Sequence, residues 1–196
     1  MKKLLISLIL VCSMLVAFAQ PSLPFSKGIN MLTWFEKPGP DRNIPPDLNK
    51  YDENDIACLK SMGVDSIRVI CTFDLLSDMP YGSGKINDDI LEKLDQLCDW
   101  AEKYQIYLII CNCYNHVVDS TEHENDVALI KAQLECVWSQ LSNRYKNRSD
   151  YIIYEITNEP GKIAANKWYK IQQEIINLIR SYDSFRTIVV SGVNWS

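Results

Sequence analysis

The sequence alternates between short apolar runs and longer segments with helical periodicity, and no other feature limits the possible fold as strongly. The apolar runs are rich in β-branched and aromatic residues, as buried strands are. Between them, apolar residues recur at steps of three and four, which predicts helices with one buried face. The predicted strands are 27–35, 66–73, 106–113, 151–157 and 187–193, and the predicted helices between them are 52–62, 87–101, 125–145 and 165–182.

Strict alternation of strands and helices predicts one α/β domain with a parallel sheet. Two architectures remain open. A doubly wound sheet could be complete with five strands, but the turn after its first strand usually carries a Gly-rich phosphate loop, and 34–40 has no such motif. A (β/α)8 TIM barrel needs about 250 residues. The 196 residues of this chain would supply about the first five βα units of a barrel, so we expect either an open sheet or a truncated barrel.

Residues 1–19 have the features of a secretory signal peptide. Lys2 and Lys3 precede an apolar run from 4 to 18, which ends in a small-x-small cleavage site. We therefore expect a secreted or periplasmic protein with its folded domain at 20–196 and no membrane contact after cleavage. A lipoprotein anchored at Cys12 is less favoured, because the three residues before that cysteine are not small.

The charge balance narrows the class of partner. The net charge is −5, and loss of Lys2 and Lys3 with the signal peptide makes the remaining chain more acidic. An acidic surface disfavours nucleic acids and anionic membranes as partners. The composition fits a soluble monomer that acts on an uncharged substrate.

Six cysteines remain after the predicted signal peptide. Export would permit disulfides, but the cysteines fall within predicted helices and strands, as buried free thiols often do. We favour free thiols, and the first bridge to test would join Cys71 to Cys111 or Cys113. The sequence has no C-x-x-C pair and no Cys/His spacing suited to zinc, so we expect no metal site and no cofactor.

Polar residues interrupt or follow three of the predicted strands: Arg68 lies in the second, Asn112-Cys113-Tyr114-Asn115-His116 ends the third, and Asn158-Glu159 ends the fourth. Arg68 lies within an apolar strand, and a buried guanidinium needs an acidic partner. On the fourth strand Glu155 and Glu159 share one parity, so Glu155 is a candidate partner of Arg68 inside a barrel while Glu159 projects over the mouth. The alternatives are an Arg68 that faces solvent on an edge strand, and Asn158 and Glu159 as an ordinary polar strand exit.

Four stretches resemble the N-terminal part of glycoside hydrolase family 5, which includes many cellulases and mannanases. They are Lys-Gly-Ile-Asn at 27–30, Leu-Lys-Ser-Met-Gly-Val-Asp-Ser-Ile-Arg at 59–68, Val-Trp-Ser-Gln-Leu-Ser-Asn-Arg-Tyr at 137–145, and Tyr-Glu-Ile-Thr-Asn-Glu-Pro at 154–160. The resemblance runs from about Gly28 to the end of the chain. Asn-Glu-Pro after a strand is its most specific part, and related barrel families share it.

This resemblance implies a retaining hydrolysis of β-glycosidic bonds by two carboxylates. Glu159 matches the general acid/base, and Asn158 matches the amide that hydrogen-bonds the 2-hydroxyl of the sugar under attack. Arg68 matches the arginine that supports the nucleophile. The histidine of the third strand matches His116, although simple alignment puts Tyr114 there.

Other roles stay open. Trp34 and Trp195 stand at strand ends, where each could stack on a sugar ring or simply pack at the barrel mouth. The resemblance places the nucleophile on a second glutamate at the end of a seventh strand, and no residue of this chain can be assigned to it. We therefore expect the chain by itself to be inactive, and the coding sequence downstream to supply the remaining units.

The function predicted from the sequence is a secreted retaining glycoside hydrolase that cleaves β-linked polysaccharide, of cellulase, endo-β-glucanase or mannanase type. The alternative is a non-catalytic, carbohydrate-binding half-barrel. A nucleotide-binding open sheet is a third possibility, and the missing phosphate loop weakens it.

Overall fold

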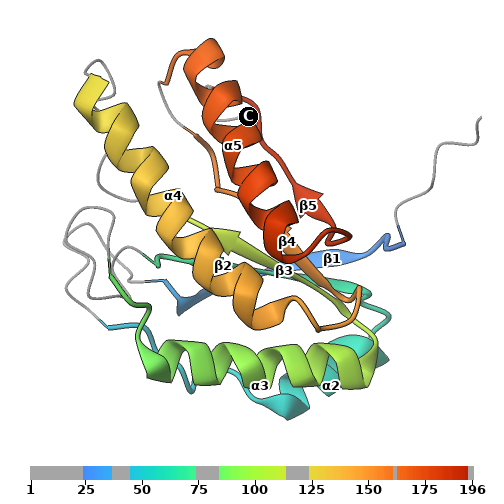
Figure 1. Ribbon diagram of the computed structural model, residues 1–196. Helices are drawn as coiled ribbons and strands as arrows, with labels where there is room; N and C mark the ends of the chain where they lie inside the picture. Colours follow the sequence, from blue (N-terminus) through green and yellow to red (C-terminus); the bar gives the residue numbers. More distant parts are fainter. Residues whose placement is uncertain (1–23, 37–44, 74–83, 114–123, 161–162, 194–196) are drawn as a thin grey trace, which may run out of the picture.

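The structure is a computed structural model that describes residues 24–36, 45–73, 84–113, 124–160 and 163–193, with only the backbone of 124–126. It contains one parallel sheet with helices packed around it (Figure 1). The strands are β1 Gly28–Phe35, β2 Ser66–Cys71, β3 Tyr107–Asn112, β4 Ile152–Glu155 and β5 Ile188–Val189. The helices are α2 Glu53–Ser61, α3 Asp88–Tyr104, α4 Glu124–Tyr145 and α5 Ala165–Tyr182.

The strand order separates the two architectures that the sequence left open. All pairings are parallel and the order is β1-β2-β3-β4-β5, the same as in the chain. A doubly wound sheet reverses its strand order at a switch point, and this sheet does not. Sequential order is the topology of a (β/α)8 barrel. The nucleotide-binding open sheet is therefore the wrong architecture for this chain.

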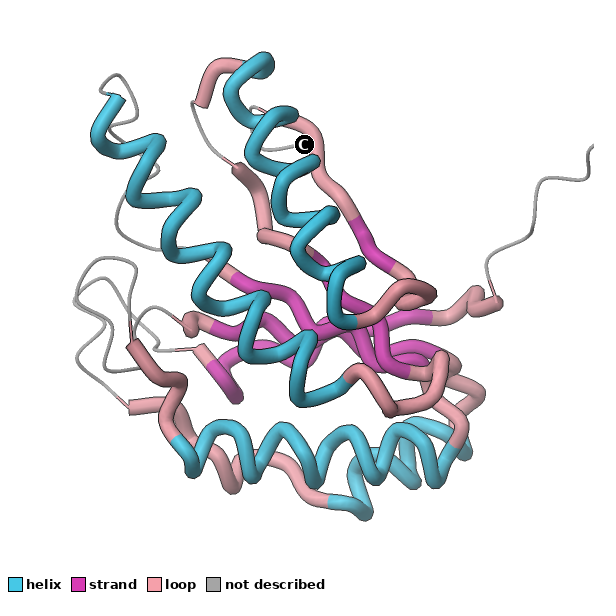
Figure 2. Tube along the Cα trace, in the orientation of Figure 1, coloured by secondary structure: helices cyan, strands magenta, loops and turns pink. Residues whose placement is uncertain are grey.

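The helices all lie outside the curved sheet (Figure 2). Helices α2 and α3 lie side by side along one part of it, and α4 and α5 lie side by side along the next. Alternate strand residues point toward them and form the buried core; Tyr154 of β4, for example, stacks on Trp138 of α4 with 5.2 Å between ring centroids. The outer face of the sheet is thus apolar, as a helix-covered parallel sheet requires.

The other face of the sheet corresponds to a barrel interior. One row of register neighbours crosses this face from β1 to β4: Asn30, Arg68, Ile109 and Ile153. Two residues further along the strands, Cys111 of β3 pairs with Glu155 of β4. Exposure falls across this face: Asn30 on β1 is exposed, whereas Ile153 and Glu155 on β4 are buried. Asn30, Arg68 and Glu155 therefore lie on the side away from the helices.

The first predicted helix is confirmed with its signals. The Asp52 side chain accepts hydrogen bonds from the backbone N–H groups of Asn54 and Asp55. The Asp55 carboxylate in turn accepts one from the Asp52 backbone N–H, which makes a capping box. Gly63 has φ +83°, in the left-handed region that glycine adopts freely, and it lies just beyond the helix. Asn87 precedes α3 as predicted, but its side chain makes no capping hydrogen bond.

The fifth strand is shorter than predicted. We expected 187–193, but only Ile188 and Val189 pair with β4. Beyond them, the Ser191 carbonyl accepts hydrogen bonds from Trp168 Nε1 (2.9 Å) and Gln172 Nε2 (2.8 Å), both on α5. The backbone there is bound to α5 side chains instead of extending the sheet.

The cysteines have different environments. Cys71, Cys98 and Cys111 are buried, Cys113 and Cys136 are half-buried and Cys58 is exposed, and all six are free thiols. Cys71 belongs to the core on the helix side, whereas Cys111 contacts Arg68 on the opposite face. A Cys71–Cys111 bridge is therefore incompatible with this sheet.

The predicted signal peptide lies outside the described residues. Of the helices that the structure describes, none combines the length and the apolar character that a membrane span needs.

A buried arginine, Arg186, binds several backbone groups at the end of the sheet opposite the strand exits. Arg186 is 3% exposed and forms an ion pair with Asp183 (2.7 Å). It also donates to four backbone carbonyls at the end of α4 and the start of β4, those of Tyr145, Arg148, Ser149 and Ile152. Cations stabilise the unpaired carbonyls of a helix C-terminus, so Arg186 joins α4, β4 and the loop before β5.

We predict that Arg186→Ala lowers the free energy of unfolding by about 3 to 5 kcal/mol, because it leaves the buried Asp183 carboxylate without its countercharge and removes a charged donor from four carbonyls. Urea denaturation of the protein measures this change. Arg180→Ala is the matched control, because the half-buried Arg180 gives Asp183 only one hydrogen bond, to its carbonyl. Equal losses in the two variants would contradict the assigned role of Arg186.

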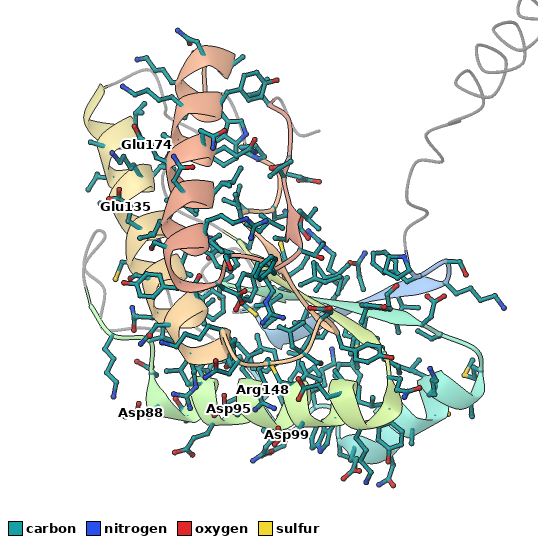
Figure 3. The ribbon with its side chains drawn as sticks, turned by 45° about the vertical axis from the view of Figure 1, so that its right-hand side comes forward. Asp88, Asp95, Asp99, Glu135, Arg148 and Glu174 are labelled. Atoms are coloured by element: carbon teal, nitrogen blue, oxygen red, sulfur yellow. The ribbon has the colours of Figure 1, made fainter. Side chains whose placement is uncertain are left out.

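Helices α3 and α4 are joined by ion pairs near the surface. Arg144 pairs with Asp95, and Arg148 pairs with Asp99 and Glu102. Figure 3 shows Asp95 and Asp99 along α3, with Arg148 beside them. Partial burial opposes ionisation of Asp95, but Arg144 outweighs it and lowers the Asp95 pKa. Burial likewise opposes ionisation of Glu102, and hydrogen bonds from Ser149 and Arg148 lower its pKa.

These lowered pKa values predict an acid-sensitive contact between α3 and α4. Carboxylates whose pKa falls on folding stabilise the protein above their unfolded pKa of about 4, and this stabilisation is lost as the pH falls through the folded pKa. We expect unfolding free energy to depend less on pH below about pH 4.5 in an Arg144→Gln/Arg148→Gln double variant than in the wild type. Denaturation curves between pH 3 and pH 6 measure this; parallel pH dependences in the two proteins would refute it.

Candidate active site

The candidate site lies where β4 ends. Asn158 and Glu159 follow the strand, and the Asn158 backbone N–H donates to the Asn112 carbonyl at the end of β3 (2.7 Å). The neighbouring residues Thr157 and Pro160 are buried. The backbone that follows β4 is thus bound to the end of β3. This places Glu159 at the carboxyl edge of the sheet, where active sites of such folds lie.

Arg68 forms the centre of the polar contacts beneath this exit. Its Nε donates to Glu155 Oε2 (2.6 Å) and its Nη2 to Glu155 Oε1 (2.7 Å), a bidentate ion pair between β2 and β4. Nη2 also donates to Asn158 Oδ1 (2.9 Å). The sequence-based expectation that Arg68 pairs with Glu155 inside the barrel is confirmed, and the solvent-facing alternative is wrong.

The pair is well shielded from water. The side chains are 22% exposed for Arg68 and 11% for Glu155. The hydrogen bond to Glu155 raises the pKa of Arg68 above its ordinary value despite the opposing effect of burial. Bidentate arginine–carboxylate pairs are stronger and more directional than single hydrogen bonds. The Arg68 guanidinium is therefore charged and held in one orientation.

Two further residues complete the cluster. Arg68 Nη1 donates to Asn30 Oδ1 on β1 (3.2 Å), and Cys111 Sγ on β3 lies 3.1 Å from Nη2. Burial raises the pKa of the Cys111 thiol, and the Glu155 charge adds to the effect, so the group is a neutral thiol. The cluster therefore spans four strands with one positive and one negative charge.

Sequence reasoning missed Asn30 and Cys111 as members of this cluster. Asn30 belongs to the Lys-Gly-Ile-Asn stretch already noted, but a role for it depended on knowing that β1 pairs with β2 in the register Asn30–Arg68. Cys111 was predicted only as a buried free thiol or as a disulfide partner of Cys71. Strand register was the missing information in both cases.

Glu159 is the one acidic residue at this strand exit that remains exposed. Among the described residues, none forms an ion pair or hydrogen bond with its carboxylate. A carboxylate that no described residue binds, next to a neutralised ion pair, is available to a ligand. The geometry thus separates a paired structural acid, Glu155, from an open one, Glu159.

A hollow of about 390 Å³ lies on the same face of the sheet, lined in part by Gly28, Asn30, Ser66 and Arg68. Its lining residues on β1 and β2 belong to the amino-terminal halves of these strands, whereas Glu159 lies beyond the carboxyl end of β4. We therefore do not identify this hollow with the candidate site.

The structure decides between the two roles that the sequence left open for Trp34, which were stacking on a sugar ring and packing at the barrel mouth. The structure buries its ring fully, against Phe35 and Tyr51, and its Nε1 donates to the Leu48 carbonyl (3.1 Å). The ring offers no free face, so Trp34 is a core residue here and not a binding residue.

Three candidates, Tyr114, His116 and Trp195, lie outside the described residues. Within the described part of the chain, no group of three or more His, Cys, Asp or Glu side chains is arranged to hold a metal ion.

The sequence matches one protein-family model and several curated proteins. The model of the family described as cellulase (glycosyl hydrolase family 5) matches residues 34–196. Endoglucanase C of Acetivibrio thermocellus is 24% identical over 182 residues, which are 88% of this chain and 51% of that protein. Endoglucanase 3 of Fibrobacter succinogenes is 27% identical over 190 residues, 87% of this chain and 27% of that protein.

Solved structures give the same fold. The family 5 lichenase from Caldicellulosiruptor sp. F32 matches with a TM-score of 0.74 at 19% identity, covering 86% of this chain and 52% of that one. Cellulose synthase subunit Z from Clostridioides difficile matches with a TM-score of 0.72 at 23% identity, covering 87% and 54%. This chain spans about half the length of these proteins, and its five strands form part of a (β/α)8 barrel, as predicted.

We predict that Arg68→Lys lowers the free energy of unfolding by about 1 to 3 kcal/mol, because a lysine cannot hold Glu155 with two parallel hydrogen bonds and reach Asn158 as well. Urea denaturation measures the loss. Arg144→Lys is the control, since Arg144 makes a comparable pair with Asp95 at the surface, where a salt bridge contributes about 0 to 1 kcal/mol. A loss at Arg68 no larger than that at Arg144 would contradict this assignment.

Proposed function

Because this chain belongs to the cellulase family, glycosyl hydrolase family 5, we propose that its protein is an exported enzyme that hydrolyses β-linked glucans with retention of configuration. Relatives named as endoglucanases and a structural neighbour named as a lichenase support a glucan. A complex of that lichenase with cellotetraose supports a site that binds a run of several sugars. Mannan is the alternative backbone, since another neighbour was solved with mannotriose.

One observation carries the proposal. The exposed Glu159 stands beside Asn158, whose amide is held by the Arg68–Glu155 ion pair at the carboxyl edge of the sheet. A polar strand exit without a catalytic role would not need a bidentate ion pair that joins β2 to β4 beneath it. Preorganised polar groups around a carboxylate that no described residue binds are what acid/base catalysis requires.

In the proposed reaction Glu159 acts twice. Its protonated form donates a proton to the glycosidic oxygen as the leaving sugar departs. Its carboxylate then removes a proton from the water that hydrolyses the glycosyl–enzyme intermediate, which returns the acid to its starting form. Asn158 hydrogen-bonds the 2-hydroxyl of the sugar under attack, where bonds strengthen as the oxocarbenium-like transition state forms.

A retaining site needs a second carboxylate about 5 to 5.5 Å from the first. We assign this nucleophile to a strand beyond the five described here. Arg68 has a donor for it, because one Nη1 N–H is not taken up by any described residue. The Arg68 charge is already balanced by Glu155, so its contribution to the nucleophile is mainly a directed hydrogen bond.

The competing function is carbohydrate binding without catalysis. The exposed Glu159 favours the enzyme, because a carboxyl group at the strand exit can transfer protons, which binding alone does not require. The two functions differ in turnover, which one substitution can test.

We predict that Glu159→Gln, made in the protein that carries this chain with its remaining barrel units, lowers kcat on soluble β-glucan by at least about 1,000-fold. Binding of a cello-oligosaccharide, measured by calorimetry, should change little, because glutamine keeps the size and hydrogen-bonding reach of the side chain. Reducing-end release measures turnover.

The control is Glu92→Gln, because Glu92 is an exposed glutamate on α3, a helix outside the sheet. It should leave both turnover and binding unchanged. Retained turnover in Glu159→Gln would remove Glu159 from the mechanism, and binding without turnover in the wild type would favour the carbohydrate-binding alternative.

A further inference from the structure

The orientation of the Asn158 amide is fixed by its partner. An arginine side chain has five N–H donors and no acceptor. Asn158 therefore has to turn its Oδ1 toward Arg68, and the 2.9 Å contact with Nη2 involves that oxygen. Its Nδ2 group then faces away from Arg68, and no described residue accepts a hydrogen bond from it. Asn158 thus presents N–H donors, and not a carbonyl, at the strand exit.

Arg68 in turn depends on other residues for its position. Its side chain extends from β2, passes Cys111 on β3 and ends at β4. A long side chain loses conformational entropy when it is held in one place. Two bonds to Glu155 and one to Asn30 hold the guanidinium plane, and only the Glu155 bonds are both short and charge-assisted.

Glu155 and Asn158 therefore act on the same guanidinium nitrogen. Nη2 donates to Glu155 Oε1 at 2.7 Å and to Asn158 Oδ1 at 2.9 Å. The two residues lie three positions apart, Glu155 within β4 and Asn158 beyond its end. If Glu155 did not direct Nη2, the guanidinium could rotate about its last torsion, and the Asn158 oxygen would lose its donor.

We propose that Glu155 is a positioning residue that acts through Arg68 to hold the Asn158 amide with its N–H donors toward the substrate, so that the site selects sugars with a hydrogen-bond acceptor at carbon 2. This inference rests on the proposed hydrolase function. The acceptor requirement follows from the donor-only side of the amide: a 2-hydroxyl oxygen satisfies it, and a 2-deoxy sugar leaves the donor unpaired.

A purely structural role for Glu155 gives a different expectation. If the ion pair only stabilises the sheet, its loss lowers the activity on every substrate in the same proportion. If Glu155 acts through Asn158, its loss lowers activity mainly on substrates that carry the 2-hydroxyl. The ratio of kcat/KM for a 2-hydroxy and a 2-deoxy substrate separates the two.

The experiment compares Glu155→Gln with the wild type in the protein that carries this chain with its remaining barrel units. Glutamine keeps one acceptor for Arg68 but replaces the other carboxylate oxygen with an N–H₂ group that cannot accept. The substrates are an aryl β-cellobioside and its counterpart lacking the 2-hydroxyl on the sugar under attack. We expect Glu155→Gln to lower the ratio of their kcat/KM values by about tenfold, the effect of one lost hydrogen bond.

A double-mutant cycle completes the test. Asn158→Ala should lower the same ratio. The double variant Glu155→Gln/Asn158→Ala should lower it no further, since both substitutions remove the same hydrogen bond from Asn158 to the 2-hydroxyl. Glu102→Gln, which weakens an ion pair on α3, is the control and should leave the ratio unchanged. Thermal unfolding of each variant checks that the folded protein is being measured.

The outcomes separate this inference from the proposed function. An equal loss on both substrates, or additive effects in the double variant, would overturn the role of Glu155 while leaving the hydrolase standing. A wild-type protein that cleaves neither substrate nor soluble β-glucan would overturn both.

Discussion

The Arg68–Glu155 ion pair is the interaction on which the rest of the site depends. It joins β2 to β4 across β3, so it forms only if the three strands keep their register and their order. A one-residue slip of either strand would turn one partner to the helix-covered face and leave a charge buried alone, at a cost of several kcal/mol. The pair therefore links the strand register of the sheet to the positions of the side chains in the site.

The two faces of the sheet carry separate tasks. Apolar residues on the helix side form the core, and Arg186 closes it at the end opposite the strand exits by binding four carbonyls. Asn30, Arg68 and Glu155 lie on the other face. Such a division lets the strand exits vary their chemistry without disturbing the core, which is why barrels of this kind hold their active sites at the carboxyl edge.

Much of the fold could be predicted from the sequence. The five strands, the four helices and the Asp52 capping box follow from apolar periodicity and from local hydrogen bonding, which act over a few residues. The predicted length of the last strand was wrong, because Trp168 and Gln172 on α5 bind the Ser191 carbonyl. Trp34 was ambiguous for a similar reason: whether an aromatic ring at a strand end packs inward depends on distant residues such as Tyr51.

The sequence by itself determined the elements, the Asn-Glu-Pro exit and the need of Arg68 for an acidic partner, since an unpaired buried charge is too costly in any fold. Only the tertiary structure decided between an open sheet and a barrel, through the sequential strand order. It also decided which residues surround Arg68. Asn30 and Cys111 are 38 and 43 positions from it in the chain, and register alone brings them to its guanidinium. Contacts between strands that pair far apart in sequence are set by global packing, which local patterns do not encode.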